Sequence, residues 1–209
     1  MRHTMPSAPL LPRLTRGLAA AAAVALAAAS GCAHAPRADH LAGPGPARFF
    51  PLAVGNQWTW EDQSPQLPAG RRGALRTVLI LERTADGFYR DDERGELKAG
   101  ADCVRDRVRQ LLCGPLVVGT SWKSVLSVSS TEKYEIAAVG ESVVTPAGTF
   151  DGCVRVRAVN HAAPGTDLVN EITYAPGVGP VRIETFAVMN GAIQQQLRAV
   201  LRAYRVEGK

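Results

Sequence analysis

Cys103, Cys113 and Cys153 carry the clearest covalent chemistry in the main part of the chain. In an oxidising compartment, three thiols allow one disulfide in three possible pairings. Cys103 and Cys113 are ten residues apart and lie beside Val104 and Leu112, a spacing that suits two positions facing each other near the base of a hairpin. We expect a Cys103–Cys113 disulfide, worth ~2–3 kcal/mol through loop closure, and a free, buried Cys153. The alternative is that all three are reduced, buried side chains.

Motifs for catalysis or metal binding are weak. Ser130-Thr131-Glu132-Lys133 fits the Ser-x-x-Lys pattern of penicillin-recognising enzymes, but it lies between two strand patterns and the companion motifs do not follow. His161 is the only histidine beyond residue 40, and no spacing suits zinc. The acidic residues between 91 and 96 lack the alternating oxygens and glycine of a calcium loop. We therefore expect no catalytic residue, no metal site and no cofactor, and a protein that is not an enzyme.

Two tryptophans close an imperfect internal repeat. Pro51-Leu-Ala-Val-Gly-Asn-Gln-Trp58 recurs 64 residues later as Pro115-Leu-Val-Val-Gly-Thr-Ser-Trp122, with five identities in eight positions. Proline fixes φ, glycine accepts unusual backbone angles, and tryptophan anchors the following strand in a core. The repeat therefore predicts one structural corner used twice, and a ligand-stacking role for Trp58 or Trp122 stays open.

The N-terminus indicates export and anchoring. Three arginines precede an unbroken small and apolar run from Gly17 to Ala29, which is shorter than the ~20 residues of a membrane-spanning helix. The run ends in Ala29-Ser30-Gly31-Cys32, which resembles the lipobox of bacterial lipoproteins, although leucine is usual where Ala29 stands. This resemblance implies cleavage before Cys32, lipid (including palmitate) on that cysteine, and anchoring to a membrane. An ordinary signal peptide with a nearby cysteine is the alternative.

Three regions follow from this interpretation. Residues 1–31 are the signal peptide, residues 32–48 are the lipidated cysteine and a tether rich in Pro, Gly and Ala, and residues 49–209 form a single β-rich domain. Without the three arginines of the signal peptide, 21 basic face 19 acidic side chains, a net charge of +2. The arginines are scattered along the domain, so we expect no nucleic-acid partner.

The domain shows the period of two that is typical of half-buried strands. Alternating segments lie at 75–82, 133–138, 154–157 and 181–185, and glycine- or proline-containing turns separate them. In the first of these segments we place Leu75, Thr77, Leu79 and Leu81 on one face. The pattern predicts an antiparallel curved sheet or an open, barrel-like meander. The segment 192–206 fits both a helix and a strand, and we interpret it as the final strand.

Three groups of residues carry a family resemblance. They are the doubled Pro-Leu-x-Val-Gly-x-x-Trp, the segment Thr145-Pro-Ala-Gly-Thr-Phe-Asp-Gly-Cys-Val154, and Tyr174-Ala-Pro-Gly-Val-Gly-Pro-Val181. Together they resemble the TapB-like group of exported bacterial proteins, most of which have no known function. The resemblance covers nearly all of the domain. It implies a curved antiparallel sheet in a cell-envelope protein and brings no catalytic residues.

Two functions remain. The first, which the sequence favours, is a non-catalytic interaction or scaffold module that holds an envelope protein partner through an exposed strand edge or face. The second is a carrier that holds a lipid or other apolar ligand in a cavity of the sheet, with Trp58 or Trp122 in its lining. Either would be lipid-anchored in the cell envelope. Because Ala33 rather than aspartate follows Cys32, we expect the outer membrane of a Gram-negative bacterium. A closed apolar cavity of ~300–1,000 Å³ would favour the carrier, whereas a filled core with an exposed apolar strip would favour the interaction module.

Overall fold

The structure is a computed structural model that describes residues 45–207. Cys32, the signal peptide and most of the tether lie outside the described residues. Asp39–Lys209 forms one compact unit, whose hydrophobic core lies within residues 49–206. Two 3-10 helices and twelve strands make up the described part: η1 (Pro46–Phe49), β1 (Gln57–Asp62), η2 (Ala69–Arg71), β2 (Leu75–Arg83), β3 (Tyr89–Asp91), β4 (Glu96–Ala99), β5 (Cys103–Arg105), β6 (Gln110–Cys113), β7 (Ser121–Ser127), β8 (Ser130–Thr145), β9 (Gly148–Ala163), β10 (Thr166–Ala175), β11 (Gly179–Met189) and β12 (Ala192–Arg205).

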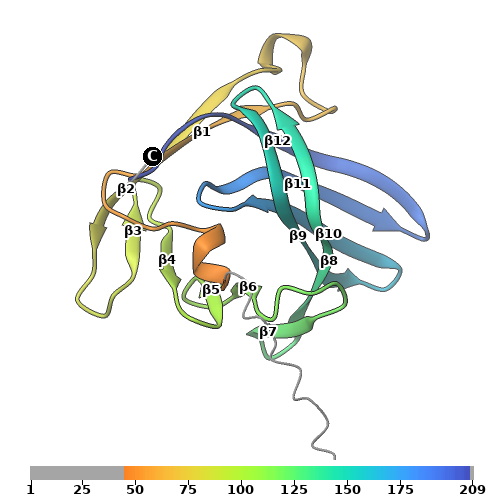
Figure 1. The fold of residues 1–209 in the computed structure, drawn as a ribbon. Helices are drawn as coiled ribbons and strands as arrows, with labels where there is room; N and C mark the ends of the chain where they lie inside the picture. Colours follow the sequence, from red (N-terminus) through yellow and green to blue (C-terminus); the bar gives the residue numbers. More distant parts are fainter. Residues whose placement is uncertain (1–44, 208–209) are drawn as a thin grey trace, which may run out of the picture. The chain divides into compact units, whose positions relative to one another are not determined.

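The strands form one antiparallel sheet in the order β6-β5-β4-β3-β2-β1-β12-β11-β10-β9-β8-β7. Each half of the chain is a meander, and the pairing of β1 with β12 joins the halves. The sheet curls so that its short strands face its long ones (Figure 1). Its two edges, β6 and β7, are consecutive in the chain. The all-β, antiparallel, barrel-like fold expected from the sequence is therefore confirmed.

The two copies of the repeat form the same corner. Gly55 and Gly119 adopt φ values of 90° and 89°. The amide of Gly55 donates to the carbonyl oxygen of Ile80 over 2.9 Å, and the amide of Gly119 donates to that of Ile136 over 3.0 Å. Each corner thus leads into a new strand. The first leads into β1, which pairs with β2, and the second leads into β7, which pairs with β8. The prediction of one corner used twice is confirmed.

The segment with ambiguous periodicity is strand β12, which pairs with β1 and with β11. Its register with β1 places Leu201 opposite Trp60 and Tyr204 opposite Trp58, and Arg202 is passed over between them. Such a bulge adds one residue, so apolar side chains three positions apart fall on the same face. The bulge therefore produces the helix-like spacing that the sequence shows, within a strand.

Helix η1 lies inside the curve of the sheet, as Figure 1 shows. Pro46 and Phe49 are buried, so the folded part begins at Pro46, within the segment that the sequence analysis places in the tether. Phe50 follows and packs against Trp58 and Tyr174, with ring centroids 5.8 and 6.1 Å apart. These aromatic rings fill the interior at the end of the sheet where β1 starts.

Strand β2 faces the opposite way from the expected pattern. Leu75 and Leu81, which we assigned to one face with Thr77 and Leu79, are exposed, whereas Ile80 is buried and Val78 packs against the core. The register explains the difference, because Val78 lies opposite Trp58, whose side chain is buried.

Candidate functional site

The curled sheet holds an apolar pocket of about 360 Å³ that is partly open to solvent. Its lining comes from β1 to β4, β6 and β10 to β12, together with Phe50 after η1. Apolar side chains dominate the lining: Phe50, Trp58, Trp60, Val78, Ile80, Leu97, Leu111, Ile172, Tyr174, Ile183 and Leu197. Polar residues Asp62, Arg76 and Asp91 also line it. Trp58 and Asp62 are four residues apart in one strand, so the pocket extends about 13 Å along β1.

Trp58, one of the two tryptophans singled out by the sequence, lines this pocket. Its indole N–H donates to the carbonyl oxygen of Val178 over 2.7 Å, and the side chain is 3% exposed. This bond fixes the plane of the ring and leaves the apolar body of the indole for the pocket wall. Gly179, with φ at +108°, lies so close to this indole that a Cβ there would be 3.1 Å from Nε1.

Trp60 is a lining residue that the sequence analysis missed. It lies two positions after Trp58 in β1, and both side chains are buried. Because residues two apart in a strand share a face, the period of two was the signal that could have identified it.

Trp122, the other singled-out tryptophan, does not reach this pocket. It stacks on Tyr134, with ring centroids 5.5 Å apart and an interplanar angle of 10°, and its indole N–H donates to the carbonyl oxygen of Gln110 over 2.7 Å. The same residue lines a different hollow of about 500 Å³ with Lys123, Lys133 and Arg157. The structure therefore does not bring Trp58 and Trp122 together.

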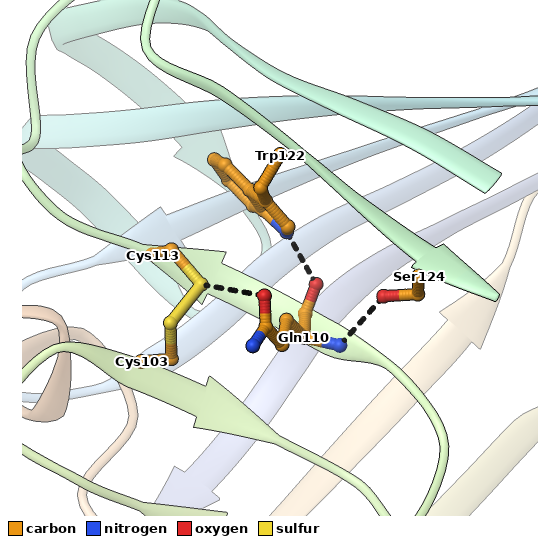
Figure 2. Close-up of a disulfide and its surroundings, with 5 residues drawn as sticks. All are labelled: Cys103, Gln110, Cys113, Trp122 and Ser124. Atoms are coloured by element: carbon orange, nitrogen blue, oxygen red, sulfur yellow. Dashed lines mark hydrogen bonds between the residues drawn. A yellow bond between two sulfur atoms is a disulfide. The ribbon is translucent and has the colours of Figure 1, made fainter.

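Side chains bridge the seam between the two sheet edges (Figure 2). Besides the bond from Trp122, the amide of Gln110 donates to Ser124 Oγ over 3.0 Å. Gln110 belongs to β6, whereas Trp122 and Ser124 belong to β7. Two side-chain bonds thus stand where a closed barrel would have a ladder of backbone bonds.

Cys103 and Cys113 lie opposite each other in β5 and β6 and are joined by a disulfide in the structure (Figure 2). Cys153 is free and buried, and burial raises the pKa of its thiol to about 11. The disulfide ties the edge strand β6 to the rest of the sheet beside the seam.

A second, smaller pocket of about 220 Å³ adjoins the first. Leu111, Ile172 and Ile183 line both pockets, so the two hollows share a wall. The smaller one also contacts polar side chains that the sequence analysis did not single out as site residues: Arg109, Glu132, Tyr134 and Asn170. Polar groups are therefore confined to particular ends of an otherwise apolar interior.

Glu132 is the most deeply buried of the charged groups there, with a side chain 6% exposed. Its Oε2 accepts a hydrogen bond from the hydroxyl of Tyr134 and lies 3.2 Å from Arg109 Nε. Burial and this hydrogen bond raise the pKa of Tyr134, so its hydroxyl keeps its proton and remains a donor. A buried carboxylate is thus held by one neutral donor and one half-exposed guanidinium.

The outer face of the long strands carries the charge alternation expected of a wet surface. Arg155 lies between Glu141 and Glu171, with N–O distances of 3.1 and 2.9 Å.

Strand geometry separates Ser130 from Lys133, because residues three apart in β8 point to opposite faces. The Ser-x-x-Lys quartet therefore does not form a nucleophile and base pair.

Among residues 45–207, no group of three or more His, Cys, Asp or Glu side chains could hold a metal ion. In the same part of the chain, no helix is long and apolar enough to span a membrane.

Comparison with known proteins identifies no family. No family model matches the chain, and no curated protein matches it. Two solved structures are similar: a proposed lipoprotein from Parabacteroides distasonis, with a TM-score of 0.43, 15% identity, 78% of this chain covered and 100% of the other, and a proposed exported protein with a YmcC-like fold from Bacteroides fragilis, with a TM-score of 0.42, 15% identity and coverages of 75% and 98%. These TM-scores and identities are too low to assign a family or a function to this chain.

Proposed function

We propose that this protein is an exported lipoprotein that carries an apolar small molecule inside its curled sheet. The apolar pocket of about 360 Å³ is the observation on which the proposal rests. Its size lies within the range of ~300–1,000 Å³ that is common for small-molecule sites. The carrier is the second of the two functions that the sequence left open, and this pocket supports it over the interaction module.

Packing energetics support the same proposal. Protein interiors are usually filled to the density of organic crystals, and a missing group leaves its neighbours without contacts. A pocket walled by Trp58, Trp60 and Ile80 gains about 0.8 kcal/mol for each methylene that leaves water to enter it. An alkyl chain therefore suits the site by its chemistry alone.

The interaction module keeps two supporting observations: the edges of the sheet, and exposed apolar side chains in and before β7, namely Val117, Val118 and Val125. Strands β6 and β7 are edges of the sheet, and exposed edges can pair with another chain. The seam bonds from Trp122 and Ser124 to Gln110 already occupy part of these edges, which weakens that alternative.

The N-terminal segment supports a cellular location for the proposed carrier. Acylation at Cys32 would tether the domain to a membrane, where acyl chains are abundant as ligands. The alanine after Cys32 supports passage to the outer membrane of a Gram-negative bacterium. This anchoring and this address are part of the proposal.

The test uses the fragment Asp39–Lys209, because this segment forms a compact unit of its own. The probe is N-phenyl-1-naphthylamine, displaced by 1-octanol, 1-nonanol and 1-decanol. Each added methylene should tighten binding by about fourfold. Absence of probe binding, or affinities that do not change with chain length, would overturn the carrier.

A matched pair of variants locates the site. Ala199 lines the pocket, whereas Ala203 lies in the same strand and is exposed. Ala199→Phe should fill the pocket and weaken the binding of 1-decanol by at least about tenfold. Ala203→Phe should leave the affinity for 1-decanol unchanged. Equal behaviour of the two variants would place any bound alcohol elsewhere.

A further inference from the structure

We infer that the ligand carries an uncharged, hydroxyl-bearing head group, which hydrogen-bonds to Glu132 in the smaller pocket while its chain lies in the larger one. This inference rests on the proposed carrier function and specifies its ligand. Leu111, Ile172 and Ile183 line both pockets, which places the two hollows next to each other.

Glu132 supplies the hydrogen-bond acceptor. A carboxylate has two oxygens, and a buried one requires partners for both. Tyr134 and Arg109 both approach Oε2. These contacts leave Oε1 as the oxygen of Glu132 that a ligand can reach. A ligand hydroxyl can donate to that oxygen and accept from the side chains around it.

Asn170 offers the complementary group in the same pocket. Its Oδ1 accepts a hydrogen bond from the hydroxyl of Thr185 over 2.8 Å, which leaves the amide Nδ2 as a donor facing no partner in the described part of the chain. A head group with an oxygen that both donates and accepts therefore fits the pair better than a pure acceptor does.

The polar residues of the larger pocket already have hydrogen-bond or ion-pair partners in the protein. Asp62 accepts from the backbone amide of Ser64 over 2.9 Å, and Asp91 accepts from that of Gly95 over 2.7 Å. Arg76 pairs with Glu93. Within residues 45–207, the other oxygen of Asp62 and of Asp91 is unpaired like Oε1 of Glu132, but both aspartates are only half-buried and within reach of water. The buried Glu132 is therefore the acceptor that gains most from a ligand hydroxyl.

The charges around Glu132 argue against a charged head. Arg109 lies 3.2 Å from Glu132 and 3.9 Å from Asp106, so its positive charge already faces two carboxylates and an anionic head would add a third. A cationic head would have to share Glu132 with that guanidinium, and an ammonium loses more hydration than a hydroxyl does on entering the interior. Moving a charge into an apolar interior without an unshared partner costs more than moving a hydroxyl there.

The experiment compares four ligands that share one chain: 1-decanol, decyl methyl ether, decanoate and decylammonium, at neutral pH on Asp39–Lys209. Decanol should bind about tenfold more tightly than the ether, because the ether lacks the donor, and more tightly than both ions. Glu132→Gln should reduce the ratio of the affinities for decanol and the ether to about threefold or less. The affinity for the ether itself should not fall. Glu135→Gln, an exposed glutamate of the same strand, is the control and should keep the wild-type preference.

The outcomes separate this inference from the carrier function. Equal, tight binding of decanol and the ether, or tighter binding of either ion, would overturn the hydroxyl head and leave the carrier intact. An unchanged preference in Glu132→Gln would do the same. Failure of all four ligands to bind would overturn the carrier itself. Thermal unfolding of each variant verifies that it is folded.

Discussion

Trp58 and Trp122 occupy the same position in two copies of one corner, yet their indole N–H groups tie different parts of the sheet together. Trp58 reaches the carbonyl oxygen of Val178, in the turn between β10 and β11, and Trp122 reaches that of Gln110 in β6. Both bonds are 2.7 Å long. The first closes the interior over the apolar pocket, and the second holds the seam between the sheet edges.

Replacing each tryptophan by phenylalanine should therefore have unequal effects. Trp58→Phe removes a buried bond and leaves a void, so we expect the free energy of unfolding to fall by about 2–3 kcal/mol. Trp122→Phe affects a partly exposed side chain and should cost about 1 kcal/mol. Urea denaturation of the two variants measures the difference. A larger loss from Trp122→Phe would contradict these separate roles.

The corner glycines give a second prediction. A Cβ at Gly55 or Gly119 would meet nothing within 4 Å, so alanine there costs energy through the positive φ alone. Gly55→Ala and Gly119→Ala should each lower the free energy of unfolding by about 1–2 kcal/mol. Gly70 is the control, since it also has open space but no positive φ, and Gly70→Ala should change stability by less than about 0.5 kcal/mol. Equal losses of stability at all three glycines would contradict the requirement for a positive φ at the two corners.

The fold was predictable where local pattern and register agree. The repeat ending at Trp58 and Trp122 indicated its own geometry, because proline and glycine fix the backbone of a corner whatever surrounds it. Strand β2 was harder, since Leu75 and Leu81 are as apolar as Val78 and Ile80. Its inner face is decided by pairing with β1, which is information that lies outside the segment.

The site was less predictable because it assembles residues from distant strands. Arg109 and Glu132 lie on opposite sides of the seam, and nothing in either local pattern indicates that the sheet curls back to join them. The period of two marks Glu132 as sharing a face with Tyr134 and Ile136, which is the one available signal that this glutamate is buried. A charged residue on an apolar face is the kind of local inconsistency that often marks a functional position.

The cysteines provide a third prediction, tested by thiol counting on Asp39–Lys209. With Cys103 and Cys113 joined, the native fragment should show no reactive thiol, because Cys153 is buried with a pKa of about 11 and the thiolate is the reactive form. Unfolding without reductant should expose one thiol, and reduction should raise the count to three. Peptide mapping without reduction should recover the Cys103–Cys113 pair.

Removing that bond should also destabilise the edge of the sheet. Cys103→Ser with Cys113→Ser should lower the free energy of unfolding by ~2–3 kcal/mol, since the bond closes a loop of about ten residues. Cys153→Ser should leave the thiol count of the native protein unchanged, because Cys153 is buried and does not react in the folded protein. Recovery of Cys103 and Cys113 as free thiols from protein isolated under non-reducing conditions would refute the pairing.

The last prediction concerns the anchor on which the proposed carrier depends. The apolar run ending in Ser30-Gly31-Cys32 predicts that the full chain, expressed in a Gram-negative host, incorporates a fatty-acid probe and enters the membrane fraction. Cys32→Ser should abolish the label, because serine cannot form the thioether on which lipoprotein processing depends. Cys153→Ser keeps the lipobox intact and should label normally, which controls for the loss of a cysteine as such. Because cleavage before residue 32 depends on that thioether, the Cys32→Ser protein should also keep its signal peptide and migrate as the longer precursor on a denaturing gel. Normal labelling of Cys32→Ser, or its cleavage to the mature length, would show that Cys32 is not the lipidated residue.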